Sequence, residues 1–265
     1  MIVNRQFRQI GGSCVALLVV TSVGCGRETL TSADVRRFGN AVARGLEYLA
    51  DPKTEAHPLQ LLALDYLQER FGLEPRFRLD ERSLKFKFKA DEETFRAYRR
   101  LMDPTDPFIP DLTPFARERM MRLALHCDKL DATAVAELEP LVVRLSQGTP
   151  YEVTHAAVAL RLSSNNGCTL PTLGSPESRR AFAVRLVGLM KDRSSIPDLR
   201  YEAMVAASLL GFSDLVPERL YLQLLNEQQA DGGWRATNLT RASSDHATML
   251  AVWALLEKTD PRKGG

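Results

Sequence analysis

The sequence predicts an all-α fold built from about five helical hairpins, with one small β-hairpin inserted near residues 76–89. Two observations lead to this prediction. Apolar residues recur at three- and four-residue steps along most of the chain, which is typical of amphipathic helices. Three consecutive hairpins then repeat, with equivalent residues 47 and 44 positions apart, and such periods are typical of stacked helical repeats.

The first 24 residues have the pattern of a signal peptide. Arg5 and Arg8 precede an apolar stretch at 10–23, which is shorter than the roughly 20 residues of a membrane-spanning helix. The segment that ends at Cys25 resembles a bacterial lipoprotein signal, in which the cysteine thiol receives the lipid. This resemblance implies anchoring in the bacterial envelope, and Gly26 after the cysteine favours the outer membrane, facing the periplasm. An ordinary cleaved signal peptide is the alternative.

The composition suits one globular domain, residues 33–260, after a tether at 25–32, because 45% of the residues are hydrophobic and 26% charged. Removal of residues 1–24 takes away two of 35 basic residues and none of 33 acidic ones, which leaves no net charge. Duplex nucleic acid binds clustered excess cations, so we do not expect it as a partner. Cys127 and Cys168 can form a disulfide in an exported chain, and two free buried thiols are the alternative.

The first part of the domain predicts helices on both sides of the β-hairpin. Helical spacing of apolar residues holds throughout, except at 76–89, where apolar and charged side chains alternate as in a strand. Prolines make residues 103–114 a rigid connector. The expected helices are at 33–50, 56–72, about 91–102 and about 115–128.

Three further hairpins pair residues 132–147 with 151–162, 177–192 with 199–211, and 217–229 with 243–258. The second member of each pair is rich in Ala and Leu on most faces, and a helix that is apolar nearly all round is buried. We therefore expect these second helices to form an inner layer. Alignment of their Ala-rich cores places His155, Glu202 and His246 at equivalent positions.

The loop that follows residue 227 contains a motif, "QQADGGW". Its Gln228, Gly232 and Trp234 fit the pattern Gln-x-x-x-Gly-x-Trp and resemble the QW motif of the terpenoid cyclase and protein prenyltransferase superfamily. With the hairpins from about 115 to 258, this resemblance implies an incomplete or modified α/α toroid. It also implies a structural role for the motif, in which the glutamine satisfies backbone groups, the glycines permit a tight turn and the tryptophan packs over it.

The catalytic motifs of that superfamily are absent from the sequence. It has no Asp-x-Asp-Asp proton donor and no Asp-Asp-x-x-Asp for a magnesium-bound diphosphate. His246 lies in a segment that resembles the zinc-binding helix of prenyltransferases, but no Asp-x-Cys upstream supplies further ligands. The sequence therefore specifies no cofactor and leaves any metal open.

Polar residues gather at the expected N-termini of the inner helices, which a ring of parallel helices brings to one mouth. Three of the four histidines lie there, and imidazole serves as acid, base or ligand near neutral pH. The candidate catalytic residues are His155, His246, Asp245 and Glu202. The candidate ligand-binding residues are His57, Tyr151, Glu152, Arg200 and Tyr201. Helix capping by the acids and hydrogen-bonded core histidines are the alternatives.

Two hypotheses about function follow. The first is a lipid-anchored toroidal binding or scaffold protein of the cell envelope, whose partner is a small molecule or an envelope protein. The second is an enzyme similar to terpenoid cyclases and prenyltransferases, with or without a metal ion, that acts on a small or apolar substrate in the mouth. If the histidines act together, the rings of His155 and His246 should enter one cavity near Glu202 or Asp245.

Overall fold

A computed structural model describes residues 31–51, 58–73, 92–101, 103–192 and 194–260. Within these residues the fold is mostly helical and contains no β-sheet, so the all-α prediction is confirmed for this part of the chain. None of the helices described is long and apolar enough to cross a membrane. Four predicted features lie outside the described residues: the signal peptide, Cys25, His57 and the β-hairpin at 76–89.

The helices follow the predicted order. In the first half they are α1 (Ser32–Ala50), α2 (Pro58–Phe71), α4 (Glu92–Tyr98), the 3-10 helix η1 (Arg99–Leu101), α5 (Ala116–His126), α6 (Ala132–Ala136) and α7 (Leu138–Leu145). In the second half they are α8 (Pro150–Asn165), α9 (Pro176–Lys191), α10 (Pro197–Leu209), η2 (Ser213–Leu215), α11 (Glu218–Glu227) and α12 (Asp245–Thr259).

One predicted helix, at 132–147, is divided in two. Helix α6 ends at Ala136 and α7 begins at Leu138. Pro140 explains the break, because its ring would collide with the carbonyl group four residues earlier, at Ala136, in a continuous helix. The proline lies in the first turn of α7, where its missing N–H costs no hydrogen bond.

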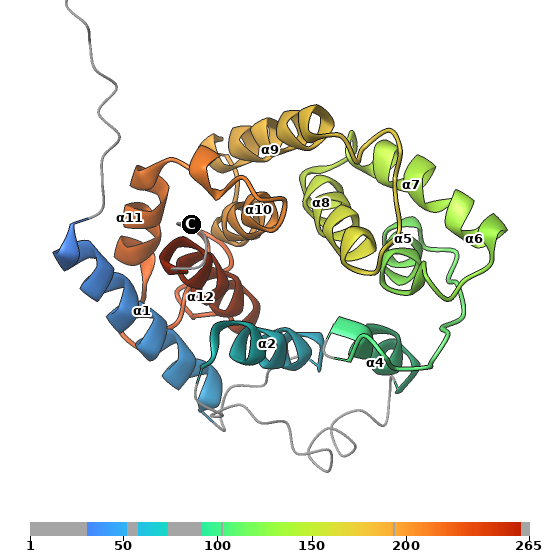
Figure 1. The fold of residues 1–265 in the computed structure, drawn as a ribbon. Coiled ribbons are helices and arrows are strands. Elements are labelled where there is room, and N and C mark those ends of the chain that lie inside the picture. Colours follow the sequence, from blue (N-terminus) through green and yellow to red (C-terminus); the bar gives the residue numbers. More distant parts are fainter. Residues whose placement is uncertain (1–30, 52–57, 74–91, 102, 193, 261–265) are drawn as a thin grey trace, which may run out of the picture.

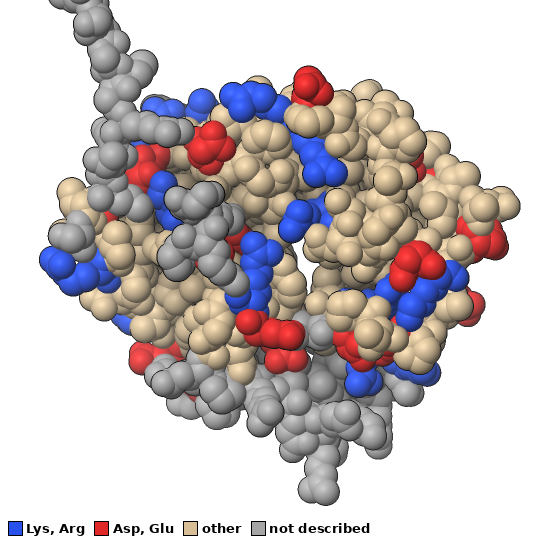
Figure 2. Space-filling view, viewed as in Figure 1, with Lys and Arg blue, Asp and Glu red and all other residues tan. Residues whose placement is uncertain are grey.

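The helices lie in two curved layers. In Figure 1, α2, α12, α10, α8 and α5 lie on the inside, and α1, α11, α9 and α7 run along the outside. Burial follows this division: twelve of the thirteen residues of α10 are buried, whereas only five of the sixteen residues of α9 are. Figure 2 shows an opening near the centre of one face, with basic and acidic side chains interspersed around it.

The motif at 228–234 fastens the C-terminal helices to α1. The side-chain amide of Gln228, at the end of α11, donates to the carbonyl oxygens of Ala41 and Gly232, at 2.9 and 2.8 Å. In return, Arg44 of α1 donates to the carbonyl oxygens of Gln229 and Ala230, both at 2.9 Å. These contacts join segments about 190 residues apart in the sequence.

Close packing completes this clasp. Gly232 has a φ of 92°, and a Cβ at this position would lie 2.6 Å from the carbonyl oxygen of Arg44, so no larger residue fits without movement. Trp234 is fully buried, and its indole N–H donates to the carbonyl oxygen of Leu224 at 2.8 Å. A Cβ at Gly45 would lie 2.9 Å from the Trp234 ring. The clasp therefore depends on glycines on both sides of the contact.

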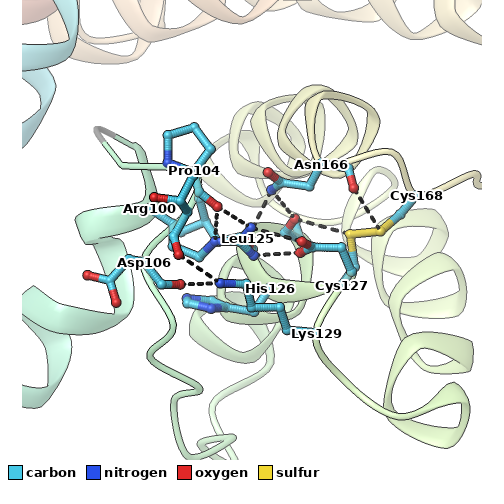
Figure 3. Close-up of polar contacts among 12 residues, drawn as sticks. Arg100, Pro104, Asp106, Leu125, His126, Cys127, Lys129, Asn166 and Cys168 are labelled. Atoms are coloured by element: carbon cyan, nitrogen blue, oxygen red, sulfur yellow. Dashed lines mark hydrogen bonds and ion pairs between the residues drawn. A yellow bond between two sulfur atoms is a disulfide. The ribbon is translucent and has the colours of Figure 1, made fainter.

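A second fastening lies where α5 and α8 end, and we call it the stapled end: Arg100, Cys127, Asp128, Asn166 and Cys168. Figure 3 labels all of these residues except Asp128. Cys127 and Cys168 form a disulfide, which decides between the two alternatives left open by the sequence. The buried guanidinium of Arg100 donates to both oxygens of Asp128, at 2.5 and 2.9 Å, and to two backbone carbonyls. Asn166 donates to two carbonyl oxygens near the end of α5.

Candidate functional site

The centre of the candidate site is the first half of α10. Pro197 begins this helix, and Asp198 and Glu202, one turn apart, share one face. Both carboxyl groups are buried, with residue exposures of 5% and 6%. Helix α10 packs between α8 and α12, so this face brings the two acids against the N-terminal turns of both neighbours.

Asp198 joins the three helices. Its Oδ2 accepts a hydrogen bond from the hydroxyl group of Tyr151, in α8, at 2.9 Å. Its Oδ1 lies 2.8 Å from Nδ1 of His246, in α12. One carboxyl group therefore holds a phenol and an imidazole from the two flanking helices.

Glu202 makes a parallel set of contacts with α8. Its Oε1 accepts a hydrogen bond from the hydroxyl group of Thr154 at 2.7 Å and lies 2.9 Å from Nδ1 of His155. Its other oxygen, Oε2, is buried and has no hydrogen-bond partner among the described residues. We call the set Tyr151, Thr154, His155, Asp198, Glu202 and His246 the acid–histidine cluster.

The contacts fix the tautomers of both imidazoles. Nδ1 of His155 faces two acceptors, Glu202 and the carbonyl oxygen of Tyr151 at 2.8 Å, so this nitrogen carries the hydrogen. Nδ1 of His246 faces a carboxylate and carries its hydrogen for the same reason. In each neutral ring the lone pair is then on Nε2. Among the described residues, no protein group bonds to either Nε2, and neither atom is buried. The side chain of His155 is 31% exposed and that of His246 is 41% exposed.

Electrostatics favour the charged form of one imidazole. Burial alone would lower the pKa of His246, but the hydrogen bond and charge of Asp198, with the charges of Glu202 and Asp245, raise it above its ordinary value. Burial and the charge of Asp198 raise the pKa of Tyr151, so its phenol stays protonated and remains a donor. The cluster thus combines two hydroxyl donors, Tyr151 and Thr154, with one imidazole, His246, whose charged form its acidic neighbours favour.

The structure separates the predicted site residues into groups. Tyr151, His155, Glu202 and His246 come together, and the charge of Asp245, the first residue of α12, acts on His246. Glu152 instead forms a capping box with Thr149, at 2.6 and 2.8 Å, as the capping alternative expects.

Arg200 and Tyr201 do not join the histidines, contrary to the prediction of one polar pocket. Both donate to Glu227 of α11, at 2.8 and 2.7 Å, on the outer side of α10. The cavity beside them has a volume of about 10 Å³, which holds at most one water molecule. Residues one and two positions from Glu202 point to other faces of a helix, which explains the separation.

Sequence reasoning missed Asp198 and Thr154. Asp198 stands four residues before Glu202, as Tyr151 stands four residues before His155, so the repeat alignment already marked it as a position on the same face. Pro197 also signals the start of a helix, which puts Asp198 in the first turn. Thr154 carried no comparable signal, because a threonine in an apolar helix is most often packed without a special role.

The described residues contain no group of three His, Cys, Asp or Glu side chains placed to hold a metal ion. The chain matches no known family model, no curated protein and no solved structure.

Proposed function

We propose that the protein is a lipid-anchored binding protein of the bacterial cell envelope, and that its acid–histidine cluster binds a polar small molecule. The observation that carries this proposal is the pair of imidazoles with Nε2 open to solvent, each held from behind by a buried carboxyl group. A few polar groups that converge at one exposed place are typical of ligand sites.

We further propose an incomplete or modified α/α toroid as the architecture. The two curved layers support it, as do the clasp that joins α1 to the last hairpin and the motif from which the resemblance was inferred. Anchoring at Cys25 is supported by the lipoprotein-like signal and by the disulfide, since structural disulfides are typical of chains exported to an oxidising compartment.

Nuclear magnetic resonance of the histidine ring protons tests the binding function. A panel of neutral, cationic and anionic small molecules is added to the full chain, and we expect at least one to shift the His155 and His246 signals together in a saturable way. The signal of His126, buried in the core, should stay unchanged in the same spectra. Saturable binding elsewhere without effect on the two rings would reject the cluster as the site.

Anchoring is tested separately by mass spectrometry of the N-terminal peptide from membranes of expressing cells. We expect an acylated cysteine at position 25 as the first residue. A Cys25→Ala variant serves as the control and should lose the lipid and the membrane association together. An unmodified N-terminus at another residue would contradict the proposal.

The second candidate is an enzyme similar to terpenoid cyclases and prenyltransferases, with the same cluster as its acid and base. The observation that favours it is the orientation of each imidazole by a carboxylate, which prepares Nε2 to accept a proton. The discriminating experiment incubates a bound ligand with the protein and measures the ligand's mass over time. A binding protein returns it unchanged, whereas an enzyme converts it and loses conversion in His246→Gln.

A further inference from the structure

We propose that the acid–histidine cluster selects a ligand that bears a primary ammonium group. This inference rests on the proposed function and deepens it, because it names the chemical class of the ligand. Asp198 and Glu202 are buried carboxyl groups whose protein partners are a tyrosine, a threonine and two histidines. Within the described residues neither is paired with a lysine or an arginine.

Other acids of the described residues show the contrast. Where a carboxylate is paired with a fixed cation, that cation is mostly an arginine: Arg70 with Glu257, Arg100 with Asp128, Arg122 with Glu118, and Arg200 with Glu227. Among the described residues, the cations that could pair with the acids of the cluster are the histidines themselves, when they are protonated. With both imidazoles neutral, two negative charges remain in a poorly solvated place, which is unfavourable.

The hydrogen-bonding pattern points to the same ligand class. Because Nδ1 of His246 donates to Asp198, and Nδ1 of His155 donates to the carbonyl oxygen of Tyr151 beside Glu202, both Nε2 atoms are acceptors in the neutral rings. A primary ammonium group brings three donors and a positive charge, so it can donate to a neutral Nε2 and balance the charge of the acids. Oε2 of Glu202 is a further acceptor that is left without a partner. A carboxylate or phosphate ligand would meet lone pairs and negative charge.

Protons compete with such a ligand. His246 faces Asp198 and Glu202 from α10 and Asp245 from its own helix, and His155 faces Glu202 and the backbone of Tyr151. When the His246 imidazole is protonated it balances these acids itself, and its Nε2 becomes a donor that repels an ammonium group. Since the pKa of His246 is raised, this competition begins at a higher pH than for a free imidazole.

The test compares three ligands of equal size that differ in charge: butylammonium, 1-butanol and butyrate. Each is titrated into the full chain in detergent micelles, with the ring protons of His155 and His246 as the readout. We expect butylammonium to bind at least tenfold more tightly than either of the others at about pH 8, and to weaken at least tenfold at about pH 5.

Matched variants assign the effect to the cluster. Glu202→Gln should lower butylammonium affinity at least tenfold, while Glu227→Gln, on the outer side of the same helix, should leave it unchanged. If Glu202→Gln does not fold, the butylammonium affinity of His246→Gln is measured instead. This variant should fold, because the His246 side chain is 41% exposed. Equal or tighter binding of 1-butanol or butyrate would overturn ammonium selection and leave the binding function standing. Ammonium selection is also overturned if butylammonium does not shift the ring signals. The binding function itself fails only if no molecule of the panel shifts them.

Discussion

The two ends of helix α8 carry polar clusters that differ in how completely they are satisfied. At the C-terminal end, Arg100 uses all three of its nitrogens and a disulfide closes the structure beside it (Figure 3). At the N-terminal end, about 24 Å away along the helix, two half-exposed imidazoles keep an open nitrogen and Glu202 keeps an unpartnered oxygen. The Arg100 guanidinium has no nitrogen left for a ligand, whereas the acid–histidine cluster keeps acceptors that a ligand with donors could use, as the proposed binding function requires.

The largest loss of stability is expected from a variant that disrupts the stapled end. Arg100→Met removes the cation that pairs with Asp128 and leaves the backbone carbonyl of Pro104 without its donor, whereas that of Leu125 keeps the hydrogen bond from Asn166. We expect the free energy of unfolding to fall by about 3–5 kcal/mol, because several hydrogen bonds of a buried guanidinium are lost at once and each bond to a charged group is worth about 1.5–3 kcal/mol, while Asp128 itself stays partly solvated. Urea unfolding followed by circular dichroism measures it. As a control, Arg37→Met, at a side chain 52% exposed, should cost less than about 1 kcal/mol.

Removal of the disulfide should have the next largest effect. Cys127 and Cys168 are 41 residues apart, and the double variant with alanine at both positions frees that loop in the unfolded chain. We expect a loss of about 2–4 kcal/mol, and a reductant should destabilise the wild type but not the variant. Ligand binding by the folded double variant should be unchanged, since the acid–histidine cluster lies at the other end of α8. If the folded double variant also lost ligand binding, the two ends of α8 would not be independent.

The two ends should also respond oppositely to pH. The pKa of His246 is raised above the ordinary value of 6.5, so its contribution to stability is full below pH 6.5 and is lost as the pH rises through the raised pKa. Burial lowers the pKa of His126, so its contribution is full above pH 6.5 and is lost on acidification.

Melting temperatures between about pH 5 and pH 8 measure this difference, for the wild type, His246→Gln and His126→Gln. His246→Gln should reduce the loss of stability on the alkaline side, and His126→Gln should reduce it on the acid side. Equal slopes in both variants would contradict the assigned pKa shifts.

The smallest change in stability should come from His155→Asn. The asparagine amide keeps a donor near the position of Nδ1, facing Glu202, and removes Nε2. We expect the free energy of unfolding to change by less than about 1 kcal/mol, while the response to ligand is lost. A destabilisation as large as that of Arg100→Met would instead place the cluster among the structural elements.

The helices were predictable from the sequence, because apolar periodicity and turn residues are local signals. The alignment of His155, Glu202 and His246 also placed these residues on adjacent helices at one level. The exact pairing was not predictable: His246 meets Asp198 and not Glu202, and this depends on how α10 is rotated and shifted against α12. The outward direction of Arg200 and the break at Pro140 were readable from helical geometry and proline chemistry.

The clasp has a consequence for how the chain folds. Its hydrogen bonds join α1 to residues 185–187 positions further along, so they form only after almost the whole domain has been made. Contacts between distant segments slow folding, because the intervening chain must first lose its freedom. We therefore expect the clasp to close last, after helices that are neighbours in the sequence, such as α9 and α10, have packed together.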